Sequence, residues 1–475
     1  MKKAHLIIDI GTGNSRVGVV STEGELLSVA TRDSVYYTDT DFADSLYFKP
    51  EEWKITLKEL AKEAIAKAGD VKILAVSASS QRQGVVLISE TGESLVGYQN
   101  GDNRGAEYLE EIDWAPVKEL TGLDPMAMYS CVKFLGTMRK QPYIAEKTKV
   151  YTSISDWVGF CFTGKVVWER SQAIQSAVYD VAAREWSERL CRAVGVEKSK
   201  LPPIVSAGSV LGKIKPAIAD ELGLSHSVVF VVGGADTQIA LTGSGARLNE
   251  VTVVSGTTTP VVKIKDVFRF YPAWNSPHAI DGQYMLECNA ASTGINLQRF
   301  KDLMLADWSY DDLIAEAKKQ KVPRCMAMMG MCPHNGDVPP VNGGFLMSNP
   351  LSHELTQVDF FHALSLDIAM AIVLCIRRIN TLDVYDKDYV VGCGGGLRSE
   401  LICQAVADLS GLELRLFRGY DQATMMGCMY LCNDALGIPS RPREQIRSVV
   451  PRKNPELEAY FERWQKLRRL LAEMN

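Results

Sequence analysis

"HLIIDIGTGNSRVGVV", residues 5–20, joins two apolar runs through a short polar segment that begins just after Asp9. A β-hairpin alone explains this pattern, because Gly, Asn and Ser tolerate tight turns between strands rich in Val and Ile. A phosphate-binding turn explains it as well: glycines let backbone N–H groups approach an anion, short polar side chains add donors, and Asp9 could support a metal-bound water. The residues of this candidate turn are Gly11, Thr12, Gly13, Asn14 and Ser15. The stretch by itself leaves both interpretations open.

The size and charge of the chain limit what it can do. At 475 residues it exceeds what one hydrophobic core usually supports, so we expect two or three domains. Its formal net charge of −5 gives no basic surface of the kind that binds nucleic acid. The apolar run "IAMAIVLCI" (368–376) is too short to span a bilayer, and the start "MKKAHLIIDI" has too short an apolar run for a signal peptide. We therefore expect a cytoplasmic protein without a membrane or nucleic-acid partner.

The cysteines indicate a reducing compartment. Eleven are scattered along the chain without a CxxC pair, and several lie inside apolar runs. We expect buried thiols rather than disulfides. The six histidines do not cluster with cysteines at the spacing of zinc ligands, so a zinc site is not expected.

The apolar periodicity predicts an α/β protein. Strands and a helix alternate at the start, residues 106–225 are expected to be mainly helical, and strands return from residue 228. The expected strands are 5–10, 16–21, 26–30, 72–78 and 388–392, and the expected helices are 51–68, 290–306, 309–320 and 358–382. The tail, 455–473, is amphipathic and charged. An alternation of this kind predicts helices packed over a sheet.

A weak internal echo suggests two related halves. "LIIDIGTGNSRVGVV" (6–20) and "FVVGGADTQIALTGSG" (230–245) both have an apolar strand, small residues with one acid, and a second apolar segment. Duplicated halves that face each other would bring both acidic turns to one cleft. We therefore expect a domain boundary near residue 230, with domains 1–230 and 231–475.

Two further turns of small residues follow expected strands. They are "SGTTT" (255–259) and "GCGGG" (392–396). Neither these nor the first turn matches the P-loop pattern or the G-x-G-x-x-G dinucleotide pattern. Turns with exposed backbone in two lobes are what a nucleotide held between the lobes would need.

Six segments in this order resemble the FGGY family of carbohydrate kinases, a branch of the actin-like and sugar-kinase fold group. The resemblance covers residues 5 to about 437, which is nearly the whole chain. The segments are "DIGTGNSR", "SSQRQGVVLIS" with "GDNRG", "SDWVGFCFTG", "GGADTQIALTGSG", "SGTTT" and "GCGGGLRSELICQAVADLSGLEL". The resemblance implies an α/β fold of two actin-like (ribonuclease H-like) lobes with a nucleotide and sugar cleft between them. It also implies transfer of the γ-phosphoryl group of ATP to a hydroxyl of a small sugar, polyol or sugar-like compound.

The resemblance assigns roles on the nucleotide side. Asp236 would act as general base on the acceptor hydroxyl, and Asp9 would support Mg²⁺ through water. The β- and γ-phosphates would lie on Gly11, Thr12, Gly13, Asn14, Gly256 and Thr257, and the adenosine on Gly394, Gly395, Gly396 and Ser399, with Gly294 as a flanking position. Structural alternatives exist: Asp236 as a turn residue between strands, and the three glycines as a helix start packed on a strand.

On the acceptor side, the resemblance points to Gln81, Arg82, Gln83 and Asp102, together with Asp236. Amide, guanidinium and carboxylate groups match the alternating donors and acceptors of a polyol. The alternative for Arg82 and Asp102 is a surface ion pair with each other.

The chain departs from the family pattern at two positions. Asn100 stands where many members have a tryptophan two residues before Asp102, and Gly136 stands where another tryptophan is frequent. Loss of two aromatic walls predicts a wider, more polar pocket, weak activity on glycerol, and better activity on a branched acceptor or a larger ketose. "SDWVGFCFTG" and "SPHAIDGQYMLE" resemble the autoinducer-2 kinase branch most, with a xylulokinase-like ketose kinase as the alternative. An actin-like ATPase without a sugar substrate is a more distant alternative, and a homodimer stays open.

Overall fold

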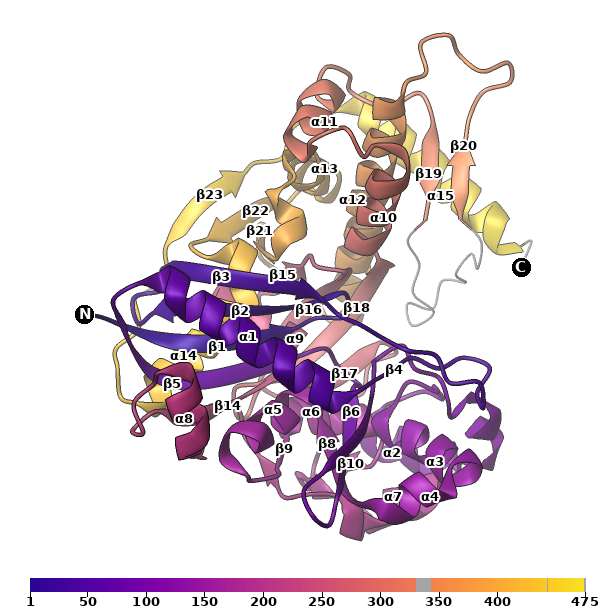
Figure 1. The fold of residues 1–475 in the computed structure, drawn as a ribbon. Coiled ribbons are helices and arrows are strands. Elements are labelled where there is room, and N and C mark those ends of the chain that lie inside the picture. Colours follow the sequence, from indigo (N-terminus) through magenta and orange to yellow (C-terminus); the bar gives the residue numbers. More distant parts are fainter. Residues whose placement is uncertain (330–342, 442, 474–475) are drawn as a thin grey trace.

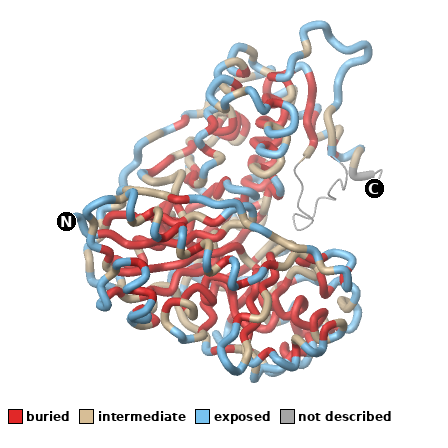
Figure 2. Tube along the Cα trace, in the orientation of Figure 1, coloured by how far each residue is buried: buried red, intermediate tan, exposed pale blue. Residues whose placement is uncertain are grey.

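The computed structural model describes residues 1–329, 343–441 and 443–473. Within these residues the chain forms two large mixed sheets with helices on their faces, and a smaller part inserted into the first (Figure 1). Buried residues follow the strands and the helix faces turned toward them (Figure 2). The prediction of an α/β protein is confirmed.

The first sheet has six strands in the order β13-β14-β5-β1-β2-β3. Its strands are β1 (Lys2–Ile10), β2 (Asn14–Ser21), β3 (Leu26–Asp33), β5 (Val71–Ser80), β13 (Val210–Lys213) and β14 (Val229–Ala235). Its helices are α1 (Pro50–Ala68), α5 (Ile154–Thr163), α8 (Pro216–Leu222), α9 (Asp236–Ser244) and α14 (Ala423–Ala435). β1 lies parallel to β5, and β5 to β14. Ile8 packs in the same cluster as α1 and α5, whereas Ile7 packs with α14, so β1 is buried on both faces and needs a continuous apolar run.

The second sheet has seven strands in the order β17-β18-β16-β15-β21-β22-β23. Its strands are β15 (Val251–Val254), β16 (Thr258–Lys265), β17 (Trp274–Pro277), β18 (Tyr284–Ser292), β21 (Tyr389–Cys393), β22 (Glu413–Phe417) and β23 (Gln445–Val449). The pairing repeats that of the first sheet: an antiparallel hairpin, β15–β16, followed by the parallel neighbours β21 and β22. The duplication therefore relates β1–β2 to β15–β16. Residues 230–245, which resemble residues 6–20 in sequence, are not the second copy of the β1–β2 hairpin. Residues 236–244 form helix α9, and β14 belongs to the first sheet.

The expected boundary near residue 230 would divide β14 from its own sheet, since Val229 to Ala235 pair with β5. The chain passes to the second sheet only after α9. We propose that the division between the lobes lies near residue 245, rather than between 1–230 and 231–475.

The inserted part contains a third sheet and most of the short helices. The sheet order is β4-β7-β6-β8. The elements are β4 (Tyr47–Phe48), β6 (Val85–Ser89), β7 (Ser94–Tyr98), β8 (Thr148–Ser153), β9 (Trp168–Glu169), β10 (Tyr179–Asp180), β11 (Glu185–Trp186), β12 (Ile204–Val205), α2 (Trp114–Thr121), α3 (Ser130–Lys140), α4 (Pro142–Lys147), α6 (Arg170–Ala173) and α7 (Glu188–Val194). Residues 106–225 are thus less helical than expected, because short strands alternate with the helices.

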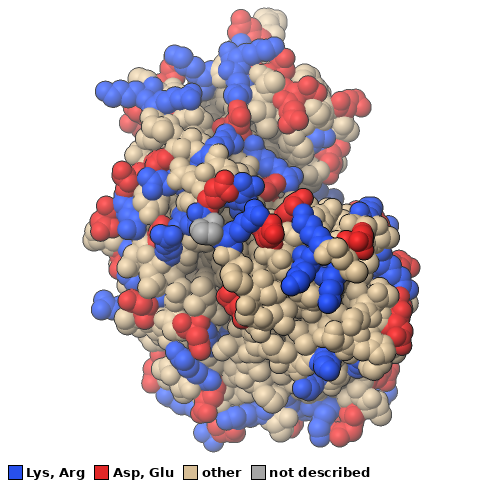
Figure 3. Space-filling model, turned by 90° about the vertical axis from the view of Figure 1, so that its left-hand side faces the viewer, with Lys and Arg blue, Asp and Glu red and all other residues tan. Residues whose placement is uncertain are grey.

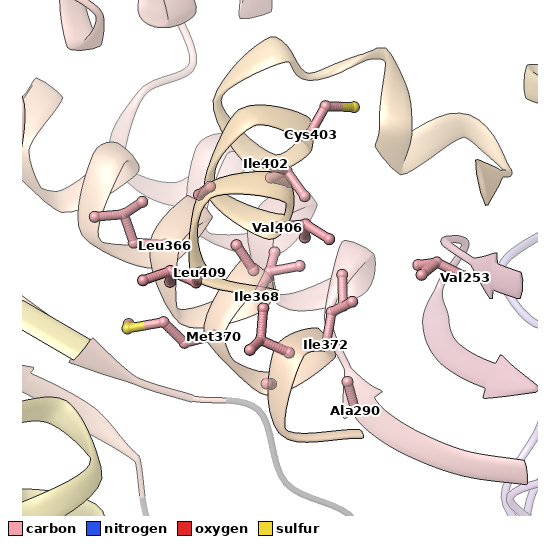
Figure 4. Close-up of a cluster of buried hydrophobic side chains, with 14 of the residues drawn as sticks. Val253, Ala290, Leu366, Ile368, Met370, Ile372, Ile402, Cys403, Val406 and Leu409 are labelled. Atoms are coloured by element: carbon pink, nitrogen blue, oxygen red, sulfur yellow. The ribbon is translucent and has the colours of Figure 1, made fainter. Parts of the chain in front are cut away.

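The second sheet is covered by α12 and its neighbours. The remaining elements are α10 (Gly294–Met304), α11 (Tyr310–Ala317), α12 (Gln357–Leu382), α13 (Glu400–Ser410), α15 (Pro455–Glu473), β19 (Met326–Met328) and β20 (Gly344–Leu346). Figure 4 shows Ile368 and Ile372 of α12 packed toward Ile402 and Val406 of α13. α12 is long and apolar enough to span a membrane, but most of its apolar stretch is buried inside the protein. It is a core helix.

Surface charge and cysteines agree with a globular protein. Basic and acidic side chains are interspersed over the face in Figure 3. The ten cysteines among the described residues carry no disulfide, and all are buried except the partly exposed Cys161. Cys332 lies outside the described residues.

Candidate active site

The candidate site lies where parallel strands end. In the first sheet β1, β5 and β14 end side by side, with Ile10 and Ala235 both paired to Ser80. The ends of parallel strands are the usual place for ligands in open α/β sheets. Asp9, the Gln81–Gln83 segment and Asp236 come directly at or after these ends, so three of the sequence-predicted groups are brought together.

Asp236 is the first residue of α9 rather than a turn residue between two strands. One of its carboxylate oxygens accepts a hydrogen bond from the Thr237 N–H (2.7 Å). Burial raises the pKa of Asp236 to about 6, Arg82 opposes this increase, and Asp9 adds to it. The carboxyl group is therefore close to the charges of both Arg82 and Asp9, and its pKa is near the value that suits a general base at neutral pH.

Asp9 is buried and forms an ion pair with Arg16 on the neighbouring strand. Arg16 also donates to the side-chain oxygen of Gln422 (3.3 Å), which belongs to the 3₁₀ turn Tyr420–Gln422 of the second lobe. Because Asp9 raises the pKa of Asp236, the two carboxylates repel each other, and a cation between them would relieve this repulsion. The described residues contain no group of three or more His, Cys, Asp or Glu side chains that could hold a metal. A pair of carboxylates fits Mg²⁺, which keeps several waters and takes few protein ligands.

The first turn is both a hairpin and an open backbone segment. Ile10 pairs with Ser15, and the Gly11 N–H donates to the Asn14 carbonyl (2.9 Å), so the hairpin interpretation is geometrically correct. A Cβ atom at Gly13 would meet no described atom within 4 Å. The hairpin thus leaves room at its tip for a ligand.

In the second lobe, the turn after β15 packs on the glycine run after β21. Cβ atoms at Gly394 and Gly396 would lie 2.2 Å from the carbonyl oxygen and Oγ of Ser255, respectively. These two glycines therefore satisfy the packing interpretation. A Cβ at Gly395 would meet no described atom within 4 Å, so this position is open to a ligand.

The other nucleotide candidates have local roles. A Cβ at Gly294 would lie 2.2 Å from the Gly256 carbonyl oxygen, so Gly294 allows α10 to start against that turn, and the Ile295 N–H donates to the Thr257 carbonyl (3.2 Å). Ser399 is the N-cap of α13, where its Oγ accepts from the Ile402 N–H (3.5 Å).

Arg82 and Asp102 are not paired with each other. Each forms an ion pair with another residue, away from the surface. Arg82 makes a bidentate ion pair with Glu287 of β18 (2.8 and 3.0 Å), which crosses from the first lobe to the second. Asp102 pairs with Arg104 through two bonds of 2.9 Å and also accepts from the Leu46 N–H. The expected surface ion pair is wrong because each residue has a different, buried partner.

Gln83 is one of the expected acceptor-binding residues, and Asn100 lies close to another, Asp102. The side-chain amides of both already have hydrogen-bond partners. Gln83 donates to the side-chain oxygen of Gln175 (2.6 Å), and the Asn100 amide donates to Thr12 Oγ1 (3.1 Å). A Cβ at Gly136 would lie 2.4 Å from the Arg104 carbonyl oxygen. The expectation that Gly136 marks a lost pocket wall is therefore wrong, because α3 packs on backbone there and leaves no space for a larger side chain.

Comparisons with known proteins show the family of this chain. The model of the N-terminal domain of the FGGY family of carbohydrate kinases matches residues 4–243. YoaC of Bacillus subtilis (strain 168), which is named as a sugar kinase, is 36% identical over 480 residues, covering 99% of this chain and 98% of that protein. This chain belongs to the FGGY family of carbohydrate kinases. An autoinducer-2 kinase of Salmonella paratyphi B is 25% identical over 97% of this chain and 93% of its own length.

The fold of this FGGY kinase matches solved structures. A ligand-bound xylulose kinase from Lactobacillus acidophilus superimposes with a TM-score of 0.81 at 18% identity, covering 99% of this chain and 97% of the other. The expected actin-like architecture of two lobes is thereby confirmed. The family implies that the enzyme uses ATP and a small-molecule acceptor.

Three residues of this FGGY kinase hold site residues in place without having been expected from the sequence. Glu287 holds Arg82, Arg16 holds Asp9, and Lys133 is fully buried, with its Nζ on the carbonyls of Gln83 and Asn100. Burial lowers the pKa of Lys133 to about 7, with Asp102 opposing the shift. The apolar spacing around Lys133 on α3 was the available signal, because a lysine on the buried face of a helix needs polar partners.

Proposed function

We propose that this chain transfers the γ-phosphoryl group of ATP to a hydroxyl of a small, uncharged polyhydroxylated acceptor, with Asp236 as general base. The position of Asp236 carries this proposal. Its carboxylate lies at the junction of β14 and α9, within the electrostatic reach of Arg82 and Asp9, and has a pKa near 6. A carboxylate that is ionised at neutral pH can accept the proton of an attacking hydroxyl.

The chain's own groups would bind and orient the two substrates. The open backbone at Gly13, Gly256 and Gly395 would receive the phosphates and the adenosine, since a Cβ at each of these positions would have free space around it or only a distant contact. Asp9 would hold Mg²⁺ through water, and the nucleotide with its Mg²⁺ supplies the phosphoryl group and neutralises its charge. Asp236 would take the hydroxyl proton on its carboxylate.

The charges near the acceptor segment favour an uncharged acceptor. Arg82 is neutralised by Glu287, and Arg104 by Asp102. An acidic acceptor would then face the carboxylate of Asp236, with both of these arginines already paired. Autoinducer-2 and ketoses are the first acceptors to test, because one relative is named as an autoinducer-2 kinase and one structure with the same fold as a xylulose kinase. The reaction would take place in the cytoplasm.

The experiment is a coupled ADP-release screen with ATP and Mg²⁺ over pentuloses, hexuloses, polyols, sugar acids and autoinducer-2. We expect an uncharged branched acceptor or ketose to stimulate ADP release well above the rate without acceptor, and glycerol and sugar acids to do so weakly. Equal ADP release with and without every acceptor would contradict the proposal and favour an ATPase.

A further inference from the structure

Each of the four polar groups of Asn100 makes a hydrogen bond to a different residue. Its side-chain nitrogen donates to Thr12 Oγ1 in the β1–β2 turn (3.1 Å), and its backbone N–H donates to the Gln81 side-chain oxygen (3.1 Å). Its carbonyl accepts from Lys133 Nζ (3.0 Å), and its side-chain oxygen accepts from the Gly101 N–H (2.8 Å). Asn100, two residues before the expected acceptor-binding residue Asp102, is thus bonded directly to the turn that is proposed to bind phosphate. We call the chain after β5 (Gln81–Gln83) and after β7 (99–102) the acceptor segments.

Gln81 and Tyr36 make a second link to the same turn. The Gln81 amide donates to the Tyr36 hydroxyl (3.1 Å) and to the Gly11 carbonyl (3.4 Å). The Tyr36 hydroxyl in turn donates to the Thr12 carbonyl (2.8 Å). Gln81 is fully buried, so these bonds are shielded from water and breaking one leaves a buried polar group unsatisfied.

Lys133 fixes the acceptor end of these bonds. Its Nζ joins the Asn100 carbonyl to the Gln83 carbonyl (2.9 Å), which also accepts from Ser130 Oγ (3.1 Å). Gln83 has φ +61°, a left-handed conformation that a glutamine adopts only when its surroundings hold it. α3 therefore holds the segments after β5 and after β7 in one arrangement.

We propose that Thr12, Tyr36, Gln81, Asn100 and Lys133 form a coupling network that transmits the state of the phosphate-binding turn to the acceptor segments. This inference rests on the proposed function. Asn100 and Lys133 are positioning residues in it: they act through Thr12 and Gln83 rather than on the reacting atoms. Phosphates that order the turn would order the acceptor segments through Asn100, and by reciprocity a bound acceptor would raise the affinity for nucleotide.

The first test measures coupling in binding. The affinity for a non-hydrolysable ATP analogue with Mg²⁺ is measured with and without the acceptor identified in the screen, in wild type and in Asn100→Leu, which keeps size but removes the bond to Thr12. We expect the ratio of the two affinities to fall about fivefold in the variant, as for the loss of one net hydrogen bond. Asn103→Leu is the matched control, because Asn103 donates to Asp44 (2.6 Å) on the surface and not to the turn. An unchanged ratio in Asn100→Leu would overturn the inference, whereas the proposed function would still stand.

The second test does not need the acceptor. Hydrogen exchange is measured with and without the ATP analogue and Mg²⁺. We expect wild type to show slower exchange both in residues 8–20 and in residues 97–104, and Asn100→Leu to keep only the first effect. Thr12→Val, which removes the bond from its other end, should behave as Asn100→Leu does in residues 97–104. Equal protection of residues 97–104 in wild type and both variants would overturn the coupling, whereas absence of nucleotide binding in wild type would overturn the proposed function as well.

Discussion

Asp236 can be tested by the substitution that keeps its shape. Asp236→Asn retains the hydrogen-bonding outline but cannot accept a proton as a carboxylate does. We expect phosphoryl transfer to fall by about 10²–10⁴-fold, the usual effect of a lost general base, with nucleotide affinity within a few-fold of wild type. Single-turnover transfer and analogue binding measure the two quantities. Transfer within a few-fold of wild type would show that another group takes the proton.

The pKa of Asp236 predicts the acid limb of the pH–rate profile. Because burial raises this pKa to about 6, kcat/KM should increase with pH up to about 6 and then level off. Arg82 lowers the pKa, so Arg82→Gln should move the acid limb to higher pH, apart from any loss of acceptor binding. Glu287→Gln is the control: it keeps the Arg82 charge beside Asp236 and should not move the limb upward. A limb that stays in place in Arg82→Gln would contradict this electrostatic assignment.

Candidate site residues can be named from the sequence, but their partners in the folded chain cannot. Asp9 lies near the end of the buried strand β1, and Asp236 comes directly after β14; a carboxylate at such a position is visible in a sequence. The partner of Arg82 is 205 positions away in another sheet, and the Asn100 amide reaches back 88 positions to Thr12. No local pattern encodes such pairs, because they depend on the register of strands that meet only in the folded chain.

At the scale of elements, two buried carboxyl groups lie behind β14, the strand that ends just before Asp236. Glu169 accepts from the Ser171 N–H (2.8 Å) and the Ser171 hydroxyl, and Ser171 Oγ accepts from the Ala235 N–H (3.1 Å). Asp156 accepts from the Glu169 N–H (2.8 Å). The end of β14, one residue before Asp236, is thus held through a buried glutamate.

These carboxyl groups predict how stability depends on pH. Burial raises the pKa of Glu169 from 4.5 to about 7, so between these values the folded state binds more protons than the unfolded state. The stability that this group contributes is therefore fully present below pH 4.5 and is lost as the pH rises through 7. Glu169→Gln should flatten the decrease in the free energy of unfolding between pH 5 and 8, measured by urea denaturation. The exposed Glu146→Gln is the control, and equal slopes in both variants would contradict the assignment.

Helices α9 and α14, which both pack on the first sheet, lie close together because each has a glycine where they touch. A Cβ at Gly243 of α9 would lie 1.8 Å from the Ala423 carbonyl oxygen, and one at Gly427 of α14 would lie 2.0 Å from the Ile239 carbonyl oxygen. Both obstacles are backbone atoms and cannot rotate away. The sequence shows these glycines but not this role, since glycine inside a predicted helix reads first as a weak point of that helix.

Gly427→Ala should therefore destabilise the protein despite the better helix propensity of alanine. We expect a loss of about 1–3 kcal/mol in the free energy of unfolding, the usual effect of overpacking, reduced by up to about 1 kcal/mol from helix propensity. Gly159→Ala in α5 is the matched control, because a Cβ there would meet the Leu211 and Phe230 side chains at 3.0 Å, and these can shift. Denaturation midpoints should rank Gly427→Ala below Gly159→Ala, and the reverse order would contradict the packing argument.

At the scale of the whole molecule, the two-lobe α/β architecture was easier to predict than the boundary between the lobes. Two lobes, an α/β class and turns at strand ends followed from apolar runs and from the family resemblance. The boundary is harder to place, because β14 is followed by only one helix before the second sheet begins, yet it pairs with β5 inside the first sheet. A strand's neighbours in a parallel sheet come from distant segments, so one sequence gives little warning of such an assignment.

The two lobes are joined by contacts that surround the site, which predicts that substrates draw them together. Arg82 and Glu287 cross between the lobes beside Asp236, and Arg16 and Gln422 cross beside Asp9. Transfer to a hydroxyl competes with transfer to water, so closure over both substrates would exclude water from Asp236. Small-angle scattering should detect a decrease in the radius of gyration, which is about 23 Å for a compact chain of this length. Asp236→Asn with ATP, Mg²⁺ and acceptor is the best sample, because it holds both substrates without turnover. Either substrate alone should give a smaller decrease, and a profile that is identical with and without both substrates would show that the lobes do not close.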